Sequence, residues 1–116
     1  MTKQTRPISW LKAARKEFED FPVGAQEVCL DALTIAAEGS KADIAKPMTG
    51  MGSGVFEIAL RFQGNAFRVM YAVQIDDDLW VIHAFQKKSK TGIKTPKQEV
   101  DLIKERLKRL KELLQQ

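Results

Sequence analysis

The sequence has few of the residues that build disulfide frameworks and metal sites. Cys29 is its one cysteine and His83 its one histidine. This excludes an internal disulfide and a cysteine-based zinc site, and we expect neither a metal nor a cofactor. We interpret Cys29 as a small buried apolar residue. No apolar run approaches the ~20 residues of a membrane helix, and the first residues, MTKQTRPISW, contain no signal-peptide stretch. We therefore expect a cytoplasmic protein.

Length and composition are those of one ordinary globular domain. The chain has 116 residues, of which 44% are hydrophobic and 29% are charged. Domains cluster near about 100–150 residues, so we expect a single domain over residues 1–116.

Positive charge is concentrated near the C-terminus. Ten basic and three acidic residues lie between Gln86 and Lys111, a net charge of +7, whereas residues 1–85 carry −2. This asymmetry indicates a polyanion or an acidic protein as partner. The alternative is a solvated helix face, which fits less well because residues 87–97 contain five lysines and no acid.

Helical periodicity occurs at both ends of the chain. It predicts one helix over residues 11–20, ended by Phe21-Pro22, and a second over residues 23–38, ended by Gly39. A third follows Pro96, with Thr95 as its N-cap and Gln98 as capping-box partner. Its apolar stripe is Val100, Ile103, Leu107, Leu110 and Leu114, and its other faces carry Lys104, Arg106, Lys108, Arg109 and Lys111.

The middle of the chain alternates with the period of strands. Residues 55–62, 67–75 and 79–86 predict an antiparallel meander, and residues 6–10 a short additional strand. The fold class is therefore α+β in the order β-α-α-β-β-β-α. A helical hairpin covers one face of a small, mainly antiparallel sheet, and an amphipathic helix closes the chain.

Strand parity brings several cations to one face of this sheet. If Phe56, Ile58 and Leu60 face the hairpin, side chains of the opposite parity form a concave surface on the other face. They are Arg61, Arg68, His83, Phe85 and Lys87, followed by Lys88. Cations stabilise charge on a phosphodiester and an imidazole moves protons. Phe85, or Tyr71 if the parity is misjudged, stacks on a base.

Structural roles are the alternatives for these residues. Arg61 pairs with Glu57 on the same face, His83 is a hydrogen-bonded residue of a half-buried strand, or Arg68 is a cross-strand surface residue. Without further signals, the residues indicate a basic, RNA-facing α+β domain.

Several segments together resemble a known family. They are Trp10-Leu11, Phe21-Pro22, Lys46-Pro47-Met48 with Gly50, GVFEI at residues 54–58, FRVMY at 67–71, HAFQKKS at 83–89, and Lys94-Thr95-Pro96. This set, which covers nearly the whole chain, resembles the HigB-like, phage-derived branch of the RelE/ParE toxin superfamily.

The resemblance implies a toxin of a type II toxin–antitoxin module. Many members cleave messenger RNA on the ribosome without a metal, by attack of the ribose 2′-hydroxyl on the adjacent phosphate. The motif match, taken together with strand parity and the basic segment, predicts Arg68, His83 and Lys87 as catalytic residues. The predicted RNA-binding residues are Lys46, Arg61, Phe85, Lys88, Lys90 and Lys94. The implied partners are the ribosome, mRNA and a helix-turn-helix antitoxin. Operator DNA is contacted only by the antitoxin.

One departure from the family pattern leaves alternatives open. Ser89 and Lys90 stand where some mRNA-cleaving relatives have a tyrosine. The general base is therefore unassigned between His83 and the lysines. The alternatives are a non-enzymatic toxin that inhibits DNA gyrase or another host protein, and a non-toxic phage-derived RNA-binding protein.

Overall fold

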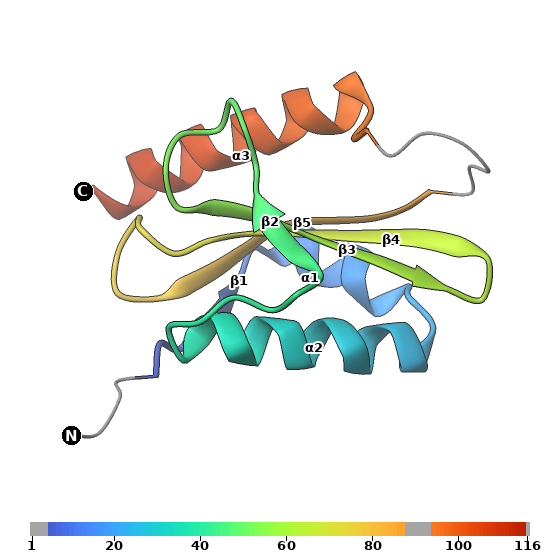
Figure 1. Cartoon of the computed structure of the whole chain (residues 1–116). Coiled ribbons are helices and arrows are strands. Elements are labelled where there is room, and N and C mark those ends of the chain that lie inside the picture. Colours follow the sequence, from blue (N-terminus) through green and yellow to red (C-terminus); the bar gives the residue numbers. More distant parts are fainter. Residues whose placement is uncertain (1–4, 88–93, 116) are drawn as a thin grey trace.

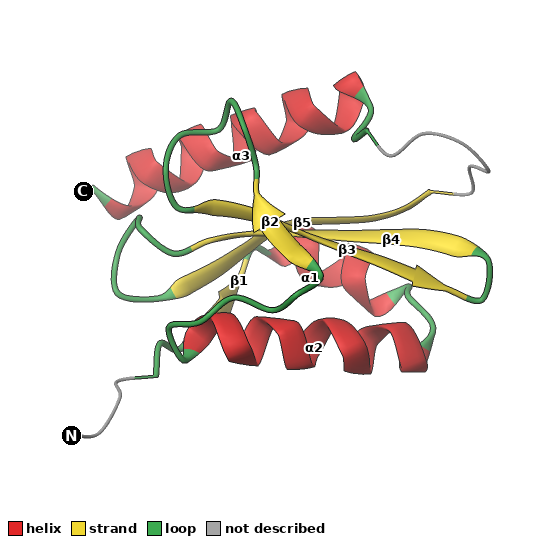
Figure 2. Cartoon of the chain, in the orientation of Figure 1, coloured by secondary structure: helices red, strands yellow, loops and turns green. Residues whose placement is uncertain are grey.

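A five-stranded sheet lies between two helical layers (Figure 1). The computed structural model describes residues 5–87 and 94–115. The strands are β1 (Ile8–Trp10), β2 (Ala45–Pro47), β3 (Val55–Phe62), β4 (Asn65–Ala72) and β5 (Leu79–Lys87); the helices are α1 (Lys12–Glu19), α2 (Val23–Ala37) and α3 (Lys97–Leu114). The strand order is β1-β5-β4-β3-β2, with β1 parallel to β5 and all other pairs antiparallel. Figure 2 shows α1 and α2 on one face of the sheet and α3 on the other.

The α1–α2 hairpin packs against the larger of two apolar cores. Small residues of α2, among them Ala25, Cys29 and Ala32, are buried against sheet residues that include Phe67 and Tyr71. Burial raises the pKa of the Cys29 thiol to about 12, so the group stays protonated and acts as an apolar residue. The interpretation of Cys29 as a buried apolar side chain is confirmed.

The opposite face of the sheet carries the second core under α3. Ile103, Leu107 and Leu110 of α3 are buried against residues that include Met70 and Ile82. The predicted stripe of the C-terminal helix therefore covers the sheet face opposite the hairpin. The predicted parity of β3 is also confirmed, because Phe56, Ile58, Leu60 and Phe62 all pack on the hairpin side.

Strand β5 contains an irregularity in its pairing with β4. Met70 lies opposite His83, but Tyr71 lies opposite Val81, so Ile82 is an extra residue in a β-bulge. Leu79 and Val81 pack in the hairpin core, whereas Ile82 packs under α3. As a result, β5 is apolar on both faces, as its composition predicted.

Three local expectations are corrected. Strand β2 was not predicted, because three residues ending in Pro47 give no periodic signal, but they pair with Phe56–Ile58 of β3. Strand β4 spans Asn65–Ala72 rather than 67–75. Thr95 and Gln98 do not form a capping box, since the N-cap of α3 is Pro96 and makes no side-chain cap hydrogen bond. The Thr95 hydroxyl instead donates a hydrogen bond to Glu57.

None of the helices in residues 5–87 and 94–115 combines the length and apolar character that a bilayer span requires.

The buried thiol provides a test of the hairpin packing. We expect Cys29 of the native protein to resist alkylation at mildly alkaline pH, because a raised pKa and burial both suppress attack by the thiolate. Unfolding in denaturant should restore ordinary reactivity. Mass spectrometry of iodoacetamide-treated native and unfolded samples measures both states, and rapid labelling of the native protein would contradict this placement of α2.

Candidate active site

Cross-strand register aligns the predicted site residues in rows on the α3 side of the sheet. The first row is Arg61, Ala66 and Lys87; the second is Ala59, Arg68 and Phe85; the third is Lys46, Glu57, Met70 and His83. Side chains in one row share a face, and neighbouring rows are about 7 Å apart along a strand. Arg61, Arg68 and Lys87 therefore occupy two adjacent rows, which we call the cationic end of this face.

A buried carboxylate organises the cations of the second and third rows. Glu57 is 5% exposed and Arg68 is 6% exposed. Arg68 Nη1 lies 3.6 Å from Glu57 Oε1, and Lys46 Nζ lies 3.9 Å from the same oxygen. The partners of Glu57 among the described residues are thus Arg68, Lys46 and the Thr95 hydroxyl, rather than Arg61, which is exposed. The ion pair between Glu57 and Arg68 orients the Arg68 guanidinium before any ligand binds.

Of the remaining predicted RNA-binding residues, the structure describes Phe85 and Lys94, and it also places the predicted catalytic residue Lys87. Lys87 Nζ donates a hydrogen bond of 3.1 Å to the Lys94 carbonyl, and the Lys94 side chain is exposed. Phe85 is half-buried, with its ring 5.6 Å from that of His83. Lys88 and Lys90 lie outside the described residues.

Tyr71 belongs to the opposite face of the sheet. It is buried in the hairpin core, stacked 5.3 Å from Phe56, and desolvation raises the pKa of its hydroxyl to about 12. Phe85, rather than Tyr71, is therefore the aromatic ring on the face that carries the cations.

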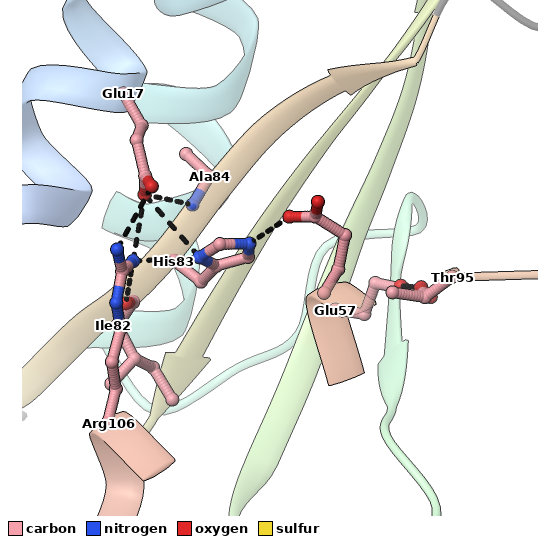
Figure 3. A network of polar contacts seen from close by, with 8 residues as sticks. Glu17, Glu57, Ile82, His83, Ala84, Thr95 and Arg106 are labelled. Carbon is pink, nitrogen blue, oxygen red and sulfur yellow. Dashed lines mark hydrogen bonds and ion pairs between the residues drawn. The ribbon is translucent and has the colours of Figure 1, made fainter. Parts of the chain in front are cut away.

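His83 is buried beneath α3 instead of lying on an open surface. It is 1% exposed. Its Nε2 lies 2.6 Å from Glu99 Oε1, and its Nδ1 lies 2.7 Å from Arg106 Nη1. The prediction that Arg106 lies on the faces of the helix away from its apolar stripe is wrong, because this side chain points to the sheet (Figure 3). The alternative of a hydrogen-bonded strand histidine describes its surroundings.

Glu17 of α1 completes the polar cluster from the other side of β5. Arg106 donates from Nη1 and Nη2 to the two carboxylate oxygens of Glu17, at 2.9 and 3.0 Å. Arg106 Nη1 also lies 3.1 Å from the Ile82 carbonyl, and the Ala84 amide donates to Glu17 at 3.3 Å. Strand β1 pairs only with Leu79–Val81, so this cluster binds backbone groups of β5 beyond the end of β1. We call Glu17, His83, Glu99 and Arg106 the His83 cluster.

Sequence reasoning missed Glu17, Glu99 and Arg106 as members of a site. A signal existed on α3, because Glu99, Ile103, Arg106 and Leu110 are spaced by four, three and four residues and share one helix stripe. Two charged residues within an apolar stripe indicate buried partners. Glu17 carries no comparable signal.

A cleft of 390 Å³ opens between α1 and α3 above β5. Its walls include Glu17, Asp20, Phe21, His83, Ala84, Phe85, Gln86, Glu99 and Leu102. Among residues 5–87 and 94–115, no group of three or more His, Cys, Asp or Glu side chains is arranged to hold a metal ion. The cleft thus presents the carboxylates of Glu17, Asp20 and Glu99 and the ring of Phe85. Phe85 lies in the second row, next to the cationic end.

Comparisons with known proteins give a family and a fold. The family described as "Phage derived protein Gp49-like" matches residues 16–108. No curated protein sequence matches the chain. An arginine-to-alanine double mutant of the Escherichia coli toxin RelE in the free state is similar in structure, with a TM-score of 0.62 and 19% identity over 91% of this chain and 98% of that one. The isolated E. coli RelE toxin gives a TM-score of 0.59 and 23% identity over 90% and 98%. The predicted fold is confirmed.

The His83 cluster predicts an unequal response to two arginine substitutions on α3. Arg106→Ala leaves Glu17 without its bidentate partner, so we expect the free energy of unfolding to fall by about 3 kcal/mol. Arg109→Ala breaks only an exposed pair with Glu105, and we expect a loss below about 1 kcal/mol. Urea denaturation of both variants measures the difference, and equal losses would refute a structural role for the cluster.

Proposed function

Because the chain belongs to the family of phage-derived Gp49-like proteins and has the fold of the RelE/ParE superfamily, we propose that it is the toxin of a type II toxin–antitoxin module. Its proposed activity is cleavage of messenger RNA on the ribosome, without a metal or cofactor, in the cytoplasm. A helix-turn-helix antitoxin is the proposed neutralising partner, and it alone contacts operator DNA.

The observation that carries this proposal is the cationic end of the α3-side face. Arg61 and Lys87 lie in one cross-strand row, with Arg68 and Phe85 in the next. Successive phosphates of a single strand need cations on one side and tolerate stacking on an aromatic ring. Phe85 supplies the ring, and Lys46 and Lys94 extend the basic surface. Lys88 and Lys90 are also proposed to bind RNA, and they lie outside the described residues.

The proposed reaction needs charge stabilisation more than covalent chemistry. The ribose 2′-oxygen attacks phosphorus, the bond from phosphorus to the 5′-oxygen breaks, and a 2′,3′-cyclic phosphate remains. Arg68, already oriented by Glu57 at 3.6 Å, stabilises the charge that grows on the non-bridging oxygens. Lys87 supplies a proton to the departing 5′-oxygen.

A second candidate function rests on the outer face of α3. Lys104, Lys108 and Lys111 surround a hollow of 280 Å³ whose apolar wall includes Met51 and Leu107. Such a surface suits an acidic protein, which is the arrangement expected of a toxin that inhibits DNA gyrase or another host protein. This function requires the three lysines and not the cationic end.

Substitution at the cationic end tests the proposed function. We expect Arg68→Ala and Lys87→Ala to abolish growth arrest and the new mRNA 5′ ends produced in translated codons, because each removes a cation of the proposed site. Arg15→Ala, which removes an exposed α1 arginine paired only to Glu19 among the described residues, should keep both. Mapped 5′ ends after induced expression provide the measurement.

Three outcomes would reject this function. Full toxicity of both variants, with circular dichroism confirming that they fold, would exclude the proposed site. Growth arrest with intact mRNA that is lost in a Lys104, Lys108 and Lys111 triple alanine variant would favour protein inhibition. The absence of growth arrest in the wild type would leave a non-toxic basic domain.

A further inference from the structure

The hydrogen bonds around His83 determine where its ring proton lies. Arg106 Nη1 is a donor that cannot accept, and it lies 2.7 Å from His83 Nδ1. Two donors do not approach so closely, so Nδ1 must present its lone pair. The single proton of a neutral imidazole is then on Nε2, which lies 2.6 Å from Glu99 Oε1 and donates to it.

The other groups around the ring are consistent with this tautomer. Glu17 Oε1 lies 3.4 Å from Nδ1, but this carboxylate already accepts two hydrogen bonds from Arg106. Across the strand pair, β4 places the uncharged Met70 opposite His83. The charged groups that face the ring are therefore Glu17 from α1 and Glu99 and Arg106 from α3.

This arrangement leaves His83 without a nitrogen for substrate. One nitrogen accepts from Arg106, the other donates to Glu99, and the residue is 1% exposed. Glu99 is 28% exposed and Glu17 is 29% exposed, and both line the cleft together with Phe85. Both oxygens of Glu17 accept hydrogen bonds from Arg106, whereas Glu99 contacts His83 through Oε1 and leaves Oε2 for a ligand. The group through which the cluster can act on a ligand is thus the Glu99 carboxylate.

We propose that Glu99 is the general base of the RNA cleavage, with His83 and Arg106 as positioning residues that orient its carboxylate. This inference rests on the proposed function. Glu99 Oε1 accepts a hydrogen bond from His83 Nε2, which keeps its proton. Glu99 Oε2 takes the proton of the ribose 2′-hydroxyl as the bond from the 2′-oxygen to phosphorus forms. The bond to the 5′-oxygen breaks and that oxygen takes a proton from the Lys87 ammonium. Exchange with water restores both groups.

The placement of Phe85 connects this base to the cationic end. Phe85 lines the same cleft as Glu99 and lies opposite Arg68 in the second row. A base stacked on its ring would place the following phosphate toward Arg68 and Lys87 and the ribose toward the cleft. In this arrangement the carboxylate reaches the ribose 2′-hydroxyl while the cations bind the phosphate.

Glu99→Gln tests the base, with Glu105→Gln as a matched control. Glutamine keeps an oxygen that accepts from His83 Nε2 but cannot take a proton, so we expect an unchanged fold and a single-turnover mRNA cleavage rate on purified ribosomes lower by at least about 100-fold. Binding to ribosomes should be little changed. Glu105 is an exposed residue of the same helix paired to Arg109, and its variant should cleave at the wild-type rate.

The tautomer is measured separately, without activity. His83 is the one histidine of the chain, so nitrogen-15 spectra of the ring need no assignment by mutagenesis. From the contacts with Arg106 and Glu99 we expect a proton on Nε2 and none on Nδ1. A ring protonated at both nitrogens in the wild type would overturn the inference.

The two proposals fail in different ways. Equal cleavage by the wild type and Glu99→Gln would overturn the assignment of the base and leave the proposed function standing. No cleavage by the wild type on any ribosome complex would overturn both.

Discussion

The sheet of this protein is incomplete along one edge, and the structure depends on how that edge is closed. Strand β1 ends after three residues, so from Ile82 onward β5 pairs with β4 on one side and has no partner strand on the other among the described residues. Arg106 and Glu17 bind the Ile82 carbonyl and the Ala84 amide there, where a further strand would otherwise pair. An ion pair between residues 89 positions apart in the chain thus occupies an edge that is open to unwanted pairing. It also joins the two helical layers across the sheet.

The α3-side face changes character along its length. Apolar packing under Ile103, Leu107 and Leu110 occupies one end, the His83 cluster lies beside it, and the cationic end follows. The two carboxylates that hold this face together have different roles. Glu57 is buried among cations, whereas Glu99 keeps part of its surface in the cleft. In the described part of the chain, no buried side-chain nitrogen or oxygen lacks a hydrogen-bond partner, so the polar groups are fixed before a ligand arrives.

Local periodicity predicted most of the fold and part of the candidate site. Strand alternation gave His83, Phe85 and Lys87 a common face, because parity within one strand requires no knowledge of distant residues. That this face is also the face of Arg68 depends on the bulge at Ile82. Alternation did not predict that α3 would cover His83, or that Glu17 would reach it from α1. Those contacts depend on which helix packs on which face. Thr95 shows the same limit, since a residue with a good capping sequence instead hydrogen-bonds to Glu57 on β3.

The extra residue in β5 determines which chemistry this strand presents. Counted from Leu79 and Val81, which pack in the hairpin core, strict alternation would place His83, Phe85 and Lys87 in that core as well. The bulge at Ile82 shifts the phase of the strand by one position, so that the remaining half points its functional side chains to the other face. Strand β5 is therefore two half-strands of opposite phase. The first half packs in the hairpin core and the second carries the site residues. One extra residue, Ile82, separates the two halves.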